Sequence, residues 1–277
     1  MCQFCSEHGE GKLWYLNANN YATELLADLE RRHFIEHFYH RVIVKGNREV
    51  SLLEKGFFKR LGIPAAIKAK VVRESKKNHF GQVLPLEDVE RVLAMAQTIT
   101  RVACGCRWAK EKKESRLCYG ITTGVPAWTD FINMDFFGSP DLARFETLDR
   151  DQALENIRSA DQQGYVHSVW TFGTPFIGAI CNCEPAYCLA LRTTVGLGLT
   201  SMFRAEYVAD VVEGVCTGCG ACLEQCHFNA LSYDDNGCCR IDREKCYGCG
   251  VCRAVCPTDA IQLHERRLDN VASRLWE

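Results

Sequence analysis

The sequence predicts an α+β fold in two parts. A mainly helical, cysteine-containing domain is expected over residues 1–203, a small α+β domain over residues 204–266, and a tail over residues 267–277. Two observations predict this division. Apolar residues recur at helical spacing along much of the N-terminal part, whereas an internal repeat with a period of 30 residues occurs in the last quarter.

The composition limits the class of protein. The 277 residues include 18 cysteines, and 47% hydrophobic with 25% charged residues is typical of a globular chain. The first residues contain neither the basic nor the apolar segment of a secretory signal, and no apolar run approaches the roughly 18 residues of a membrane span. We therefore expect a cytoplasmic protein, in which closely spaced cysteines are metal ligands or redox groups rather than disulfides.

The N-terminal elements follow from periodicity and capping signals. Three amphipathic or surface helices, a capped helix that ends at Gly164, a β-rich strand, and a short helix that ends near Arg192 are expected. The first four helices span residues 21–44, 64–77, 86–100 and 147–163, and the strand spans residues 165–172.

Basic residues are concentrated over residues 31–80, which include parts of the first two predicted helices. Residues 31–80 contain thirteen Lys and Arg but four Glu. No nucleic-acid recognition motif accompanies this charge, and the net charge of the chain is −2, so we expect no nucleic-acid partner. Solvated helix faces that dock an acidic partner are the better interpretation. His33, His37 and His40 share one helical face, and Glu30-x-x-His33 resembles a di-iron ligand pair, but no second pair completes such a site.

Six thiols in the N-terminal part lie in loops beside predicted element ends. Such spacing predicts a metal or cluster site, formed by Cys104, Cys106, Cys118, Cys181, Cys183 and Cys188. Near the first residue, Cys2 and Cys5 add two more candidate ligands. Eight thiols would satisfy two tetrathiolate sites, or one cluster and several reactive cysteines, and the pattern does not choose between them.

The C-terminal repeat carries the strongest signal. Both halves have the pattern Cys-x2-Cys-x2-Cys-x3-Cys, with ligand candidates Cys216, Cys219, Cys222 and Cys226, then Cys246, Cys249, Cys252 and Cys256. Three thiolates within seven residues suit the several irons of a cubane better than one zinc ion. The glycines between them allow the backbone to wrap closely around such a group.

This repeat resembles the bacterial-type ferredoxin with two [4Fe-4S] clusters, over about residues 205–265. The resemblance implies a ferredoxin-like, pseudo-twofold α+β domain, in which the fourth cysteine of each run ligates the other cluster. One cluster would then take Cys256 with the first three cysteines of the first run, and the other would take Cys226 with the first three of the second run. His227 departs from the usual proline, and we interpret it as a surface substitution. Asn236-Gly237 predicts a hairpin, and the adjacent Cys238 and Cys239 are interpreted as strand residues.

A second resemblance covers about residues 85–265. Cys104-Gly105-Cys106-Arg107 and Cys181-Asn182-Cys183 are similar to elements of uncharacterised 4Fe-4S-binding proteins of anaerobes. That group implies iron-sulfur binding in the N-terminal part but no substrate. The chain departs from the group where Glu184-Pro185-Ala186-Tyr187 replaces a denser run of cysteines.

These patterns predict an iron-sulfur electron-transfer protein of the oxidoreductase type. Single electrons would pass through two ferredoxin [4Fe-4S] clusters to one or two further clusters in the N-terminal domain, between redox partner proteins that act as donor and acceptor. One alternative is an anaerobic reductase in which an open iron site or a reactive thiol, such as Cys106 or Cys188, converts a small-molecule substrate. A second alternative is a zinc-bound scaffold with an appended ferredoxin. The sequence contains no nucleotide-binding motif, and a flavin stays open as a cofactor because many flavin sites leave no short motif.

Overall fold

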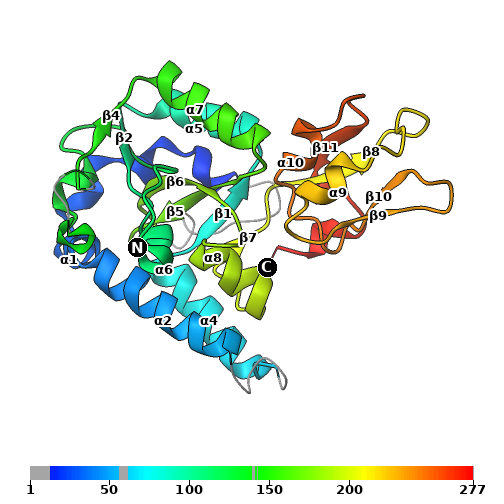
Figure 1. The fold of residues 1–277 in the computed structure, drawn as a ribbon. Coiled ribbons are helices and arrows are strands. Elements are labelled where there is room, and N and C mark those ends of the chain that lie inside the picture. Colours follow the sequence, from blue (N-terminus) through cyan, green and yellow to red (C-terminus); the bar gives the residue numbers. More distant parts are fainter. Residues whose placement is uncertain (1–12, 56–61, 139–140, 142, 277) are drawn as a thin grey trace.

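The computed structural model describes residues 13–55, 62–138, 141 and 143–276. A larger N-terminal part is built around one sheet, and a smaller C-terminal part lies against one side of it (Figure 1). The α+β class predicted from the sequence is confirmed. The N-terminal part nevertheless contains a seven-stranded sheet that the expectation of a mainly helical domain did not include.

The sheet has the strand order β4-β2-β3-β6-β5-β1-β7. Its strands are β1 (Gly81–Leu84), β2 (Thr98–Val102), β3 (Cys118–Thr122), β4 (Glu146–Thr147), β5 (Val166–Thr171), β6 (Ile177–Cys183) and β7 (Met202–Phe203). All neighbouring strands pair antiparallel except β1 and β7, which are parallel. Strands β5 and β1 are buried along their whole length, because both faces of the sheet are covered.

Two helices cover one face of the sheet. They are α5 (Leu86–Met95) and α7 (Arg150–Gln162), which lie together in Figure 1. Their apolar sides, represented by Val92 and Ile157, pack with Val169 and Ile180 of the sheet. A capping box at Asp149 begins α7, because its side chain and that of Gln152 satisfy backbone N–H groups that would otherwise have no partner.

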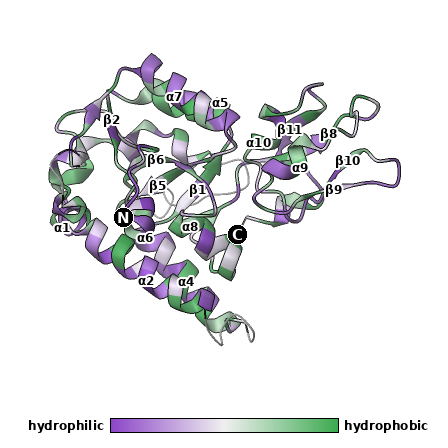
Figure 2. Ribbon diagram, viewed as in Figure 1, coloured by the Kyte–Doolittle hydropathy of each residue, from purple (hydrophilic) through white to green (hydrophobic). Residues whose placement is uncertain are grey.

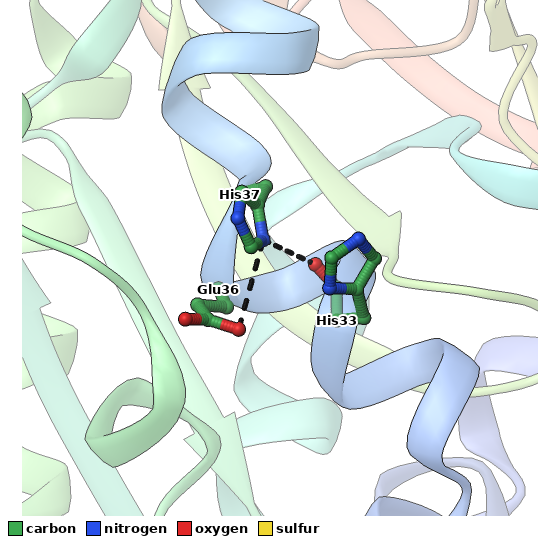
Figure 3. Close-up of side chains that lie close together, drawn as sticks. All are labelled: His33, Glu36 and His37. Carbon is green, nitrogen blue, oxygen red and sulfur yellow. Dashed lines mark hydrogen bonds and ion pairs between the residues drawn. The ribbon is translucent and has the colours of Figure 1, made fainter.

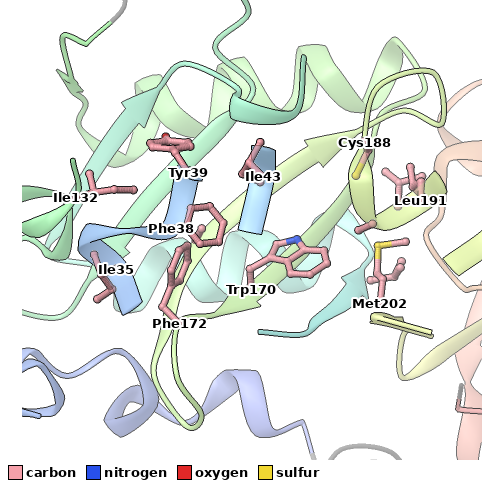
Figure 4. Packing of buried hydrophobic residues seen from close by; sticks show 14 of the residues in the cluster. Ile35, Phe38, Tyr39, Ile43, Ile132, Trp170, Phe172, Cys188, Leu191 and Met202 are labelled. Carbon is pink, nitrogen blue, oxygen red and sulfur yellow. The ribbon is translucent and has the colours of Figure 1, made fainter. Parts of the chain in front are cut away.

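The opposite face is covered by shorter helices and a long helical pair. The helices are α1 (Leu29–Glu36), a π-helical turn (Tyr39–Val44), α2 (Lys45–Lys55), α4 (Ala65–Asn78), α6 (Gly105–Glu111) and α8 (Leu189–Leu191). Phe38, Trp170, Phe172 and Leu191 form part of the core on this face (Figure 4). Both α2 and α4 carry hydrophilic and hydrophobic residues (Figure 2), and α4 buries none of its residues.

Two expected helices have different boundaries from those predicted. The helix expected over residues 86–100 ends at Met95, and β2 begins at Thr98, because the β-branched run Thr98-Ile99-Thr100 favours a strand. The helix expected over residues 21–44 is divided into short 3₁₀, α and π turns. Asp28 is the cause of one break, since its side chain accepts hydrogen bonds from the N–H groups of Glu30 and Arg31 and so begins a new helix.

The C-terminal part contains two small antiparallel sheets of two strands each, and two short helices. Strand β8 (Tyr207–Val211) pairs antiparallel with β11 (Ile261–Glu265), and β9 (Leu231–Tyr233) pairs antiparallel with β10 (Cys239–Ile241). The helices are α9 (Ala221–Gln225) and α10 (Val251–Ala254). After β11 the chain continues in two 3₁₀ turns, where Ala272 is buried against this part.

No helix within the described ranges is long and apolar enough to cross a membrane.

Candidate metal centres

The two halves of the C-terminal repeat have the same local geometry. Gly218 and Gly248 have φ of +69° and +71°, and Gly220 and Gly250 have φ of +80° and +83°. A Cβ at Gly248 would lie 2.0 Å from the carbonyl oxygen of Tyr207. Only glycine fits this close approach in the left-handed region, so each glycine pair turns the backbone around its cysteines.

Four cysteines from both halves of the repeat line one small internal cavity, and we call them the proximal set. They are Cys226, Cys246, Cys249 and Cys252. The Sγ of Cys246 accepts hydrogen bonds from the N–H groups of Ala209 and Gly248, both at 3.4 Å. Burial raises the pKa of Cys249, Cys252 and Cys246, so in the absence of a metal these three thiols would be protonated.

The other four cysteines, which we call the distal set, are Cys216, Cys219, Cys222 and Cys256. The Sγ of Cys256 accepts from the N–H of Ala260 at 3.3 Å, as that of Cys226 does from Ala230 thirty residues earlier. Cys219 is exposed, in contrast to the buried Cys249 at the matching position of the proximal set. The distal set is therefore closer to solvent.

Cys239 contributes to the surroundings of the distal set. Its N–H donates to Cys216 Sγ at 3.3 Å, and its own thiol lies 3.6 Å from that of Cys222. It opens β10, as a strand residue would. The sequence pattern gave no sign of its sulfur contact, because that contact depends on how β10 folds back on the first run.

The comparisons with known proteins agree with this geometry. The family model described as a 4Fe-4S binding domain matches residues 240–262. The C-terminal part of the chain therefore contains a ferredoxin-type 4Fe-4S domain, of the kind used in iron-sulfur electron transfer. A ferredoxin from Pyrobaculum islandicum is 43% identical over 58 residues, which are 21% of this chain and 54% of the ferredoxin. The match thus spans about half the length of that relative.

The six N-terminal thiols predicted as one site are brought together on one face of the sheet. Cys118 and Cys181 are directly opposite each other on β3 and β6, and Cys183 lies two residues further along β6 on the same face. Cys104 precedes α6, Cys106 lies in its first turn, and Cys188 caps α8. All sixteen cysteines within the described residues are free thiols.

The six sulfurs form a continuous series of hydrogen bonds. The order of contacts along the series is Cys106, Cys104, Cys118, Cys181, Cys183 and Cys188, and the single proton of Cys118 is shared between Cys104 and Cys181. The accepted hydrogen bonds lower the pKa of Cys104 and of Cys181, while donation to a neighbour raises the pKa of the other four. The arrangement thus favours the thiolate, which is the metal-binding form, at two positions.

The polar groups around these thiols fit a sulfur-containing cluster. Backbone N–H groups of Arg107, Leu189 and Leu191 donate to Cys104, Cys106 and Cys188 respectively. Arg107 Nε and Trp108 Nε1 are the two side-chain N or O atoms, among the residues described, that are buried without a partner. Both follow directly on the Cys104-Gly105-Cys106 element. Buried donors usually have acceptors, and Arg107, which borders the same cavity as the six thiols, leaves one donor unused there.

The arginine of this element is held firmly in place. The Arg107 guanidinium pairs with the Glu184 carboxylate and lies over the ring of Tyr187, 4.2 Å from its centroid. Both partners belong to the segment Glu184-Pro185-Ala186-Tyr187, which the sequence analysis singled out. The departure in sequence therefore supplies a salt bridge and a ring contact beside the thiols.

Two other predicted groups have different outcomes. Cys2 and Cys5 lie outside the described residues. His33 and His37 do approach each other, but with Glu36 rather than Glu30, and their ligand atoms lie within 4.8 Å of one another (Figure 3). His33 and Glu36 are exposed, and His37 Nδ1 is already 3.0 Å from the His33 carbonyl oxygen. The group is the ordinary contact of helix neighbours three and four residues apart.

A buried polar network that sequence reasoning missed lies on the face of the sheet covered by α7, which is the face opposite the N-terminal thiols. His167 of β5 bonds through Nδ1 to Asn182 Oδ1 at 2.6 Å and through Nε2 to Asp161 Oδ1 at 3.2 Å. Asn182 separates Cys181 from Cys183, and Asp161 is near enough to Cys249 to act on it electrostatically. His227, interpreted from the sequence as a surface substitution, contacts the Gly164 carbonyl of the N-terminal part at 2.8 Å.

Proposed function

We propose that the protein is an iron-sulfur electron-transfer protein with three clusters in series. The distal and proximal sets would each hold one [4Fe-4S] cluster, and the six N-terminal thiols would hold a third. The observation that carries the proposal is the convergence of those six thiols on one site beside the ferredoxin-type domain.

The contacts between the two parts of the chain support the order of the series. Cys249, Val251 and Phe228 belong to the same apolar core as Ala103 and Cys188, and Arg253 of α10 pairs with Glu87 of α5 at 2.6 Å. The proximal set is thus the one nearer the N-terminal thiols. The exposed Cys219 marks the distal set as the one that meets a redox partner protein in solution.

The series of thiol contacts also suggests which residues would ligate the third cluster. A cubane takes four cysteines, and Cys104, Cys118, Cys181 and Cys183 are the four consecutive members in the middle of the series. Cys106 and Cys188 are its two ends. We assign them no ligand role, which leaves two thiols beside the cluster.

A second candidate function is a reductase in which the N-terminal centre acts on a small molecule. A cavity of about 570 Å³ lies beside the six thiols and is bounded by them, a volume typical of small-molecule sites. A protein that only relays electrons has no need of such a space at its last centre. In this candidate the ferredoxin-type domain supplies the electrons.

Iron and acid-labile sulfide analysis of the anaerobically purified chain tests the proposal. We expect about twelve irons, and a loss of about four in Cys118→Ser, which removes a middle thiol. Cys188→Ser is the matched control, since the same atom is exchanged at the end of the series, and it should keep all of them. Zinc is measured on the same samples. A wild-type content of about eight irons would contradict the third cluster.

A second variant tests the C-terminal ligands. Cys249→Ser should remove one [4Fe-4S] signal from the low-temperature electron paramagnetic resonance spectrum of the reduced protein and leave the other signals in place. An unchanged spectrum and iron content would show that the proximal set holds no cluster.

A further inference from the structure

The 570 Å³ cavity extends well beyond the cysteines. Its floor follows β6 from Cys183 through Cys181 to Ala179 and continues onto Trp170 and Phe172. With a strand rise of about 3.3 Å per residue, Ala179 lies roughly 13 Å from Cys183. A cluster held by the thiols would therefore occupy one end of the cavity and leave the aromatic end open.

The aromatic end is built from flat rings. The His79 ring contacts Trp170 and Phe38, each with ring centroids 4.9 Å apart, and Phe172 at 5.3 Å, and Phe38 also contacts Phe172 at 4.8 Å. Figure 4 shows Phe38, Phe172 and Trp170 side by side on this face of the sheet. Such walls favour a flat ring system, because offset stacking and edge contacts add to the gain from apolar burial.

Helix α4 forms the roof of the cavity. The residues that it contributes, Ile67, Val71, Ser75 and Asn78 among them, recur every three to four positions and so share one helical face. No residue of α4 is buried, and Ile67 is 51% exposed. The inner side of the helix therefore faces unfilled space, and a bound molecule would cover it.

The charges at the cavity indicate an uncharged ligand. Lys45 and Glu49 of α2 pair with each other at 3.9 Å, and Arg107 pairs with Glu184 at the cysteine end. Charges of both signs line the helical side. The lining contains four basic side chains, Arg41, Lys45, Lys70 and Arg107, and three acidic ones, Glu49, Glu74 and Glu184. These charges nearly balance, so the walls offer little to attract a ligand of large net charge.

We propose that the aromatic end of the cavity binds a flat, uncharged, apolar ring compound, with one edge directed towards the end that holds the six N-terminal thiols. The inference deepens the reductase candidate, on which its redox meaning rests, by naming the class of substrate. Binding itself depends only on the shape and chemistry of the cavity.

The test uses 2-naphthol, an uncharged flat molecule, in anaerobic calorimetric titrations of the full-length protein. We expect one site per chain. Ser75→Trp, which adds a large ring to the roof, should weaken binding at least tenfold. Lys77→Trp is the matched control: it adds the same side chain to the same helix at an exposed position that does not line the cavity, and it should bind as the wild type does.

Absence of binding to the wild type, or equal binding by Ser75→Trp, would overturn the inference. Circular dichroism and iron content of each variant establish that it has folded. The same samples separate this inference from the proposed function. If 2-naphthol binds but the iron content shows no third cluster, the inferred binding site is supported and the third cluster is rejected. If a third cluster is present but 2-naphthol does not bind, the third cluster is supported and the binding site is rejected.

In the loaded protein, 2-naphthol should also change the electron paramagnetic resonance signal of the N-terminal cluster and leave the two C-terminal signals unchanged. A change confined to the C-terminal signals would place the ligand elsewhere and so contradict the inference.

Discussion

At the scale of single residues, the aromatic end of the cavity changes the pKa of one titratable group, His79. Its Nδ1 donates a hydrogen bond to the carbonyl oxygen of Thr171 at 2.5 Å. The ring is packed among the uncharged rings of Phe34, Phe38, Phe172 and Trp170. Burial lowers the pKa of His79 to about 4, although the hydrogen bond to Thr171 opposes the change. The imidazole is therefore neutral in the folded protein at neutral pH.

This shift predicts how stability depends on pH. A histidine in the unfolded chain has a pKa of about 6.5, so the unfolded chain takes up the proton first as the pH falls. The stability contributed by neutral His79 is complete above about pH 6.5 and is lost as the pH falls towards 4. Between pH 7 and pH 5 the wild type should lose about 1–2 kcal/mol more than His79→Gln, which keeps a donor for Thr171.

Anaerobic urea unfolding at several pH values, followed by far-ultraviolet circular dichroism, measures this difference. The other histidines are the same in the wild type and in His79→Gln, so the difference between the two stability curves is due to position 79 alone. Parallel stability curves for the two proteins would show that position 79 does not cause the dependence.

At the scale of elements, the turns between the cysteines of the ferredoxin-type domain depend on glycine. Gly248 has φ of +71°, and an added Cβ would lie 2.0 Å from the Tyr207 oxygen and 2.7 Å from its carbonyl carbon. Gly237 in the β9–β10 hairpin has φ of +78°, but an added Cβ there would meet nothing within 4 Å. The two positions share a backbone conformation and differ in the space around it.

Alanine substitutions at Gly237 and Gly248 separate the cost of backbone strain from the cost of a steric clash. Gly237→Ala should cost about 1 kcal/mol, which is the cost of placing a side chain in the left-handed region. Gly248→Ala should cost several times as much, because β8 cannot move away without breaking its pairing with β11, and it should reduce the iron content. Urea unfolding and iron analysis of both variants check this. Equal stability losses would mean that the Tyr207 contact is relieved at little cost.

The elements also show what the sequence could and could not predict. The cysteine repeat predicted the ferredoxin-type domain because its ligands and glycines are close in sequence. The helices at α4 and α7 were found from periodicity and capping. The seven-stranded sheet was missed because strands such as β1 and β3 are short, buried on both sides, and lack the alternation that marks a half-exposed strand. That the six thiols share a face follows from the register of β3 with β6, which no local pattern contains.

At the scale of the whole molecule, the proximal and distal sets of cysteines differ in their exposure to solvent. The proximal set is mostly buried, and its Cys249 belongs to the apolar core that the two parts share. The distal set is on the far side, where Cys219 is exposed. Protection from solvent therefore increases from the distal set towards the interface.

This arrangement predicts the order in which the clusters are lost. A ferrous-iron chelator added under mild oxidation should release about four irons rapidly from the distal set and the remainder more slowly, because burial slows the access of both reagents. Absorbance of the iron–chelator complex follows the release, and paramagnetic resonance of samples frozen during it identifies the cluster. Cys219→Ser should abolish the fast phase and leave the slow release unchanged. If the fast phase persists in that variant, the first cluster to be lost is not the distal one, and the exposure of Cys219 does not determine the order of loss.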